Sequence, residues 1–101
     1  MISLITPPEA LLKIAKLTKE RRLFMNITQS ELSDRSGVSL SVIRKFERTG
    51  KISLESFLKL SLVLDFMHDI LKSLEINVES FSSVDEIMAS NAARLRKRAR
   101  R

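Results

Sequence analysis

The stretch ITQSELSDRSGVSLSVIRKFE, residues 27–47, decides the fold. Thr28 and Glu31 have the spacing of a capping box, in which a hydroxyl and a carboxylate each accept a hydrogen bond from a free backbone amide at the start of a helix. Gly37 follows soon afterwards and can adopt the positive φ that a sharp change of direction needs. Ser39 can then cap a second helix. Two short helices joined by a tight, glycine-containing turn form a helix-turn-helix, which the sequence therefore predicts across this stretch.

Further helices are predicted on both sides of this motif. One opens at Pro7 and Pro8, because proline tolerates the first turn of a helix. Its apolar spacing predicts four core-facing positions, which are Leu11, Ile14, Thr18 and Met25. The later helices are expected from Ser39 to about Thr49, from Ser53 through the apolar run at 62–66, over 67–74, and over 84–93 after a polar link at 77–83. The fold class is therefore expected to be all-α, with five or six helices.

In a helix-turn-helix the second helix lies in the major groove of DNA, while the first lies across the backbone. Val38, Ile43 and Phe46 must hold that second helix to the core, so its other side chains face outward. Arginine and lysine there can donate to guanine or phosphate, and leucine and valine can pack on a thymine methyl group or simply within the protein. The predicted DNA-binding residues are Gln29, Ser39, Leu40, Ser41, Val42, Arg44, Lys45, Arg48 and Lys51.

Length and composition favour a single small helical core. A chain of 101 residues with two glycines and two prolines suits helices with short connections. The absence of cysteine excludes disulfides and thiolate metal sites. No apolar run reaches the roughly 18 residues that span a bilayer, and no signal peptide is evident, so we expect a cytoplasmic protein associated with the nucleoid through DNA. No phosphate-binding glycine loop, catalytic triad or metal cluster is evident, so we expect neither an enzyme nor a cofactor site.

The net charge of +6 is concentrated at the C-terminus. Six basic side chains lie within residues 94–101, so the rest of the chain is neutral overall. Residues 9–51 are rich in basic and residues 52–93 in acidic side chains, which favours one face turned toward phosphate. We expect a DNA-binding domain at 1–75 and a C-terminal extension at 76–101, with a short helix and a basic tail. Three interpretations of the tail stay open, namely a disordered solubilising end, an arm along the DNA backbone, or an ordered contact with a partner.

The stretch from 19 to 66 resembles the Cro/phage-repressor (XRE) helix-turn-helix family. The resemblance is carried by residues 27–47, quoted above, and by SLESFLKLSLVLDF at residues 53–66. It implies a lambda-repressor-like fold. It also implies that the glutamine after the capping threonine, here Gln29, clamps a DNA phosphate.

The resemblance further implies a structural pair between Arg22, in the first predicted helix, and Glu47, at the end of the second helix of the helix-turn-helix. The helical spacing independently predicts an acidic partner, because Arg21 and Arg22 both fall near the core-facing positions of the first predicted helix. An unpaired arginine in that position is costly.

Apolar side chains near the fifth predicted helix exceed what one small core can hide, which predicts a homodimer. The expected dimer residues are Phe66, Met67, Ile70, Leu71 and Leu74. A dimer would present two reading helices to a palindromic operator and act as a transcriptional repressor.

Within the family, TQSEL at 28–32, the Phe46-Glu47 pair and SLESFLKLSLVL at 53–64 resemble antitoxins of the HipB type. Such antitoxins repress their own operon and hold a HipA-like kinase toxin, and the ending RLRKRARR at 94–101 resembles regulators encoded beside such kinases. The resemblance implies an autoregulating antitoxin. The alternative is a stand-alone XRE-type or phage-type repressor without a toxin partner.

Overall fold

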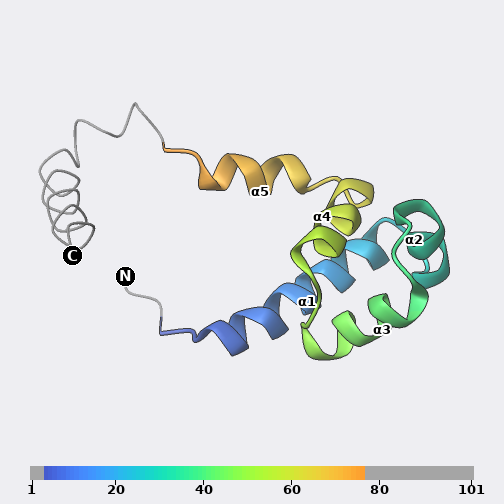
Figure 1. Cartoon of the computed structure of the whole chain (residues 1–101), viewed down its shortest axis with the longest axis horizontal. Helices are drawn as coiled ribbons and strands as arrows, with labels where there is room; N and C mark the ends of the chain where they lie inside the picture. Colours follow the sequence, from blue (N-terminus) through green and yellow to red (C-terminus); the bar gives the residue numbers. More distant parts are fainter. Residues whose placement is uncertain (1–3, 77–101) are drawn as a thin grey trace, which may run out of the picture.

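The computed structural model describes residues 4–76 and contains five α-helices, with no strand among these residues (Figure 1). The helices are α1 (Pro7–Phe24), α2 (Gln29–Ser36), α3 (Leu40–Thr49), α4 (Leu54–Val63) and α5 (Met67–Leu74). The prediction of an all-α fold is confirmed. The link predicted at 77–83, the helix predicted at 84–93 and the basic tail at 94–101 lie outside the described residues.

Hydroxyl side chains begin the helices where the sequence places them. The Thr28 hydroxyl accepts from the Glu31 amide at 3.0 Å, and the Glu31 carboxylate accepts from the Thr28 amide at 3.3 Å, which completes the capping box. The hydroxyls of Ser39 and Ser53 accept from the amide three residues further on, at 3.3 and 3.1 Å. Each cap satisfies a backbone donor that the helix itself leaves unpaired and is worth about 1 kcal/mol.

The inward face of α1 differs from the prediction. Of the four expected positions only Thr18 is buried, and the exposed fractions are 43% for Leu11, 41% for Ile14 and 38% for Met25. The buried residues of α1 are Ala15, Thr18 and Arg22. Near Leu11 the two helices α1 and α3 approach closely, since a Cβ added at Gly50 would lie 2.6 Å from the Leu11 carbonyl oxygen, and Met25 lies beyond the last residue of α1. Small residues and an arginine therefore face α3, and larger apolar residues turn outward.

The end of α4 also differs from the prediction. The apolar run at 62–66 is not a continuous helix, because Asp65 adopts a left-handed φ of 63°. The Phe66 amide donates to the Ser61 carbonyl at 2.9 Å and the Asp65 amide donates to the Leu62 carbonyl at 3.4 Å. These two bonds form a Schellman motif, which ends a helix and turns the chain.

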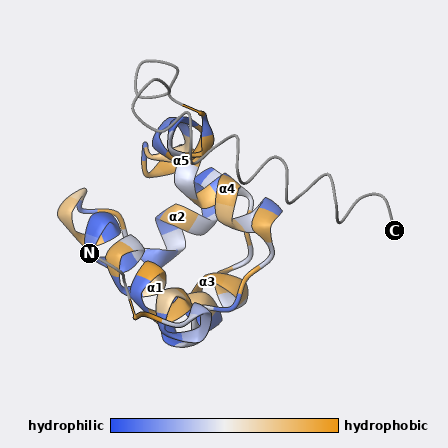
Figure 2. Cartoon of the chain, turned by 90° about the vertical axis from the view of Figure 1, so that its left-hand side faces the viewer, coloured by the Kyte–Doolittle hydropathy of each residue, from blue (hydrophilic) through white to orange (hydrophobic). Residues whose placement is uncertain are grey.

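The core lies between α1, α2, α3 and α4, and α5 is attached to it through α4. Among the described elements, α1 packs on α3, α2 packs on α3 and α4, and α5 packs on α4 alone. The buried apolar residues are Ala15, Ile27, Leu32, Val38, Ile43, Phe46, Leu60 and Leu64. Hydrophobic segments alternate with hydrophilic ones along these helices (Figure 2). In Figure 1, α5 and the first half of α1 both extend away from the end of the molecule that holds α2 and α3.

Within residues 4–76 no helix has the length and apolar character that crossing a membrane requires.

Candidate nucleic-acid interface

The turn between α2 and α3 is fixed by its own side chains. Gly37 ends α2 in the left-handed region, with φ 77°. The Ser33 hydroxyl donates to the Val38 carbonyl at 2.7 Å, and the Val38 amide donates to the Ser36 hydroxyl at 3.1 Å. The Val38 side chain is buried in the core. The angle at which α3 leaves α2 is therefore set by backbone conformation, by hydrogen bonds and by packing together.

The two sides of α3 differ sharply in exposure. Ile43 and Phe46 are 0% and 1% exposed and hold the helix to the core. Leu40 is half-buried at the start of the helix. The outward side chains on and next to α3 are exposed and comprise Ser39, Ser41, Val42, Arg44, Lys45, Arg48 and Lys51. This helix thus presents a polar and basic surface from a rigidly held base.

A hollow of about 300 Å³ lies between α3 and the N-terminus of α4. It is lined by Val42, Lys45, Lys51, Ile52, Ser53 and Ser56. Two lysines and the N-terminal end of a helix border the hollow, and each favours an anion such as a DNA phosphate. The sequence prediction included Val42, Lys45 and Lys51 but missed Ile52, Ser53 and Ser56, which lie before and at the start of α4. The Ser53 cap was the available signal, because it places the start of α4 directly after Lys51.

Arg22 and Glu47, expected to pair, form a bidentate ion pair beneath this surface. The Nε and Nη2 atoms of Arg22 donate to the two carboxylate oxygens of Glu47 at 2.7 and 3.0 Å, and both side chains are nearly buried, with 7% and 6% exposed. The Nη1 atom of Arg22 also donates to the Ile27 carbonyl at 2.8 Å. The pair therefore joins α1, the α1–α2 link and the end of α3 at one point.

Gln29 has a partner within the protein that the sequence did not indicate. Its Nε2 atom donates to the Oε1 atom of Glu47 at 3.0 Å, so the half-buried side chain leans on the ion pair. A glutamine amide carries two N–H donors. One can therefore stay on Glu47 while the other is offered to a phosphate at the start of α2, and Glu47 orients the amide.

Arg21 pairs with no acid among residues 4–76, contrary to the expectation for an arginine near the inward stripe. Its side chain is exposed, and its Nε and Nη2 atoms donate to the backbone carbonyls of Leu64 and Asp65 at 2.7 and 3.1 Å. Because the guanidinium group is solvated and hydrogen-bonded, it needs no carboxylate partner.

The five expected dimer residues lie at the junction of α4 and α5 and along α5. Phe66, Met67 and Ile70 are half-buried, while Leu71 and Leu74 are 52% and 78% exposed. No residue of α5 is buried. The apolar surface that motivated the dimer prediction is thus present, and dimerisation itself stays a prediction.

The sequence of this region matches a known protein family. Residues 19–68 match the Helix-turn-helix family model, which is of the XRE type. The chain carries an XRE-family helix-turn-helix domain. This family consists of DNA-binding transcription regulators, and the match contains every residue of the predicted DNA-binding set. No curated protein and no solved structure matches the chain significantly.

In a helix-turn-helix domain the second helix of the motif enters the major groove, and here that helix is α3. The α1 segment before residue 19 and most of α5 lie outside the matched range. These two segments are the ones that extend away from α2 and α3 in Figure 1.

Proposed function

We propose that this XRE-family regulator is a sequence-specific transcriptional repressor that binds a palindromic operator as a dimer. The observation that carries the proposal is the two-sided character of α3. Ile43 and Phe46 fix its inner side, so the exposed side chains at 41–45 are held in one orientation relative to a bound duplex. A rigidly held helix of this kind suits the reading of base edges.

The exposed residues of α3 divide into base readers and backbone contacts. Arg44 and Lys45 are the candidates for donating to guanine O6 and N7, and Ser41 suits a base edge or a phosphate. Leu40 and Val42 are placed at the beginning of the helix, where apolar contact with a thymine methyl group is feasible. These residues would supply the sequence preference of the protein.

Phosphate contacts would fix the register of the complex from both sides of α3. Gln29 offers an amide donor at the start of α2, and the hollow beside Lys45 and Lys51 offers two cations and the start of α4. Arg48, exposed in the last turn of α3, adds a further cation. Contacts of this kind bind any duplex and set orientation without reading sequence.

The apolar side chains on α5 and before it favour a second copy of the chain as the partner. A two-fold pair through Phe66, Met67, Ile70, Leu71 and Leu74 would cover the surface that the described domain leaves exposed. Two copies of α3 would then lie about 34–36 Å apart, one turn of DNA. Light scattering at micromolar concentration tests this, and a monomer mass that persists when operator DNA is added would contradict it.

Operator binding is tested with duplexes selected by the protein from a random pool. Arg44→Ala and Lys45→Ala should each lower the ratio of operator affinity to mixed-sequence affinity, because a base contact is worth about 1–3 kcal/mol of discrimination. Lys59→Ala is the charge-matched control, since Lys59 lies on α4 in an exposed pair with Glu55. An unchanged ratio in both α3 variants would contradict their assignment as base readers.

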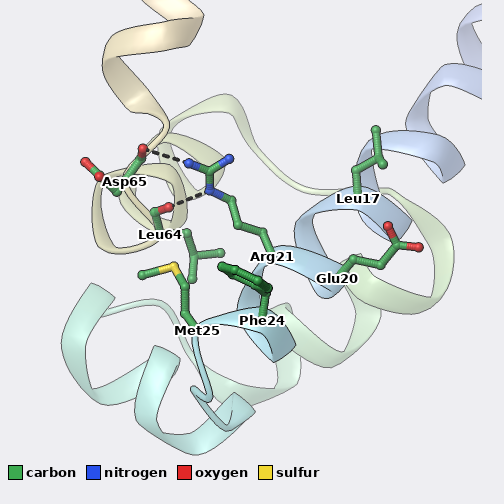
Figure 3. Close-up of a pocket in the computed structure, with 7 residues that line it drawn as sticks. All are labelled: Leu17, Glu20, Arg21, Phe24, Met25, Leu64 and Asp65. Atoms are coloured by element: carbon green, nitrogen blue, oxygen red, sulfur yellow. Dashed lines mark hydrogen bonds between the residues drawn. The ribbon is translucent and has the colours of Figure 1, made fainter.

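The more specific form of the proposal is an autoregulating antitoxin that holds a HipA-like kinase toxin. The exposed apolar end of α1 favours a protein partner, because Leu23 and Phe24 are 53% and 88% exposed. Phe24 also lines a hollow of about 640 Å³ between this end of α1 and the α4–α5 junction (Figure 3). Co-expression with a neighbouring kinase-like reading frame tests the idea. A stable complex that Phe24→Ser disrupts supports it, and the absence of a complex favours a stand-alone repressor.

A further inference from the structure

The junction between α4 and α5 turns the chain at a residue that is not glycine. Asp65 occupies the left-handed region with φ 63°, a conformation that L-residues adopt at a cost. The α4 helix ends in the Schellman bonds to Ser61 and Leu62 described above. Only Leu64, Asp65 and Phe66 lie between the last residue of α4 and the first residue of α5, so the junction is short.

Arg21 holds this junction from a different helix. Its guanidinium group donates from Nε to the Leu64 carbonyl at 2.7 Å and from Nη2 to the Asp65 carbonyl at 3.1 Å (Figure 3). The last carbonyls of a helix lack partners within the helix, and a cation beside them also suits the negative end of the helix dipole. Arg21 thus acts as a C-terminal cap of α4 that is supplied by α1.

The same guanidinium group lies at the end of a row of aromatic rings. Its Cζ atom is 5.2 Å from the centroid of the Phe66 ring, which begins α5. The Phe66 ring is 5.7 Å from that of Phe57 in α4, and the Phe57 ring is 5.7 Å from that of Phe46 in α3. A line of ring contacts therefore connects α3 to the start of α5, and the Arg21 guanidinium group lies over the Phe66 ring at the end of this line.

Few other contacts restrain α5 within the described part of the chain. It packs on α4 alone, and none of its own residues is buried. Its direction relative to α3 therefore depends on its packing against α4, the αL turn at Asp65, the aromatic row and the two hydrogen bonds from Arg21. Of these, the Arg21 bonds are the ones that tie the junction directly to α1, and α1 packs on α3.

We infer that Arg21 is a positioning residue that sets the direction of α5 relative to α3. It thereby sets the separation of operator half-sites to which a pair of chains binds. The inference rests on the proposed function, in which α5 joins two copies on a palindromic operator. Arg21 acts through α5 and touches no DNA. Its loss leaves each copy able to bind a half-site but lowers the advantage of binding two half-sites at a fixed separation.

The test uses the full chain and an operator that the wild-type protein selects from random duplexes. Arg21→Met keeps the apolar stem and removes both hydrogen bonds, and Lys13→Met is the control, because Lys13 is an exposed cation on the same helix. Binding is measured on the operator, on one isolated half-site, and on operators whose half-site separation changes one base pair at a time. We expect Arg21→Met to bind the half-site like the wild type and the operator about tenfold more weakly, because both exposed hydrogen bonds to the junction are lost and tenfold corresponds to about 1.4 kcal/mol.

The spacing profile is the readout that a purely stabilising role would not move. The wild type and Lys13→Met should show one preferred separation, whereas Arg21→Met should bind neighbouring separations almost equally. Arg21→Lys should restore part of the preference, because a lysine can still reach a carbonyl and the Phe66 ring.

Two results would overturn the inference while the proposed function stands. One is an Arg21→Met profile with the wild-type optimum, and the other is an equal loss on half-site and operator that follows a lowered melting temperature. If the wild type binds no duplex, or selects single sites instead of inverted repeats, the proposed dimeric function fails and this inference fails with it.

Discussion

Two regions of the molecule are fixed in different ways, the reading unit formed by α2 and α3 and the arm formed by α5. The reading unit is held by buried groups, including Ile43, Phe46 and the Arg22–Glu47 pair. The arm is held by the αL turn at Asp65 and by hydrogen bonds from the exposed Arg21. Breaking a buried charge pair leaves an unpaired charge in the interior, whereas loss of the exposed bonds from Arg21 to backbone carbonyls leaves no buried charge. Substitutions of the buried groups that hold the reading unit should therefore act on stability, and substitutions at the junction with the arm should act on geometry.

The largest effect is expected at the ion pair of the reading unit. Arg22→Met leaves Glu47 buried without its cation, and this should lower the free energy of unfolding by about 3–5 kcal/mol. Urea unfolding followed by circular dichroism measures the change. The double variant Arg22→Met/Glu47→Leu is the control, because it removes both charges together and should recover most of the loss. A single variant as stable as the wild type would show that the pair is solvated.

The second largest effect distinguishes two glycines with almost the same backbone conformation. Gly37 and Gly50 have φ 77° and 80°, but an added Cβ meets nothing within 4 Å at Gly37 and lies 2.6 Å from the Leu11 carbonyl oxygen at Gly50. Gly37→Ala should therefore cost about 1–2 kcal/mol, for the left-handed conformation alone.

Gly50→Ala should cost roughly 1–3 kcal/mol beyond that, because α1 and the α3–α4 turn must move apart. Thermal unfolding of the two alanine variants under the same conditions gives the difference directly. Equal melting temperatures would mean that α1 yields at Leu11 without loss of packing.

The sequence predicts most of this fold because its signals are local. The capping box at Thr28, the hydroxyl caps at Ser39 and Ser53, and the glycine at 37 each act within four residues, so the helix boundaries at these positions follow from the sequence alone. The same holds for the exposed side chains of α3. Their outward direction follows from helical spacing once Ile43 and Phe46 are placed inward.

The features that could not be predicted from the sequence depend on contacts between segments that are distant along the chain. The inward face of α1 depends on its close approach to Gly50, which is distant in the sequence. The apolar residues of α1 predicted an inward stripe, but most residues of that stripe are exposed. The end of α4 at Asp65 carries no glycine or asparagine, and its left-handed turn is supported by Arg21, 44 residues earlier. The Gln29–Glu47 bond likewise joins two helices, so spacing within either one does not indicate it.

A smaller effect is expected from Thr28→Ala, which removes half of the capping box. The Glu31 amide loses its acceptor, and the free energy of unfolding should fall by about 1 kcal/mol. Because α2 also carries Gln29, binding to a mixed-sequence duplex should weaken along with stability. Thr28→Ser retains the hydroxyl and should preserve both properties, so a loss in that variant as well would assign the effect to something other than the cap.

The smallest effect on the described domain is expected at the far end of α1. Phe24 is 88% exposed, so Phe24→Ser removes almost no buried area and should change the free energy of unfolding by no more than about 0.5 kcal/mol. Duplex affinity should also stay unchanged, because Phe24 lies outside the proposed DNA-binding set. A large drop in melting temperature would instead mean that this side chain is covered in the intact protein, by a second copy or by residues outside 4–76. Repeating the measurement across protein concentrations separates these two, since only a contact between copies depends on concentration.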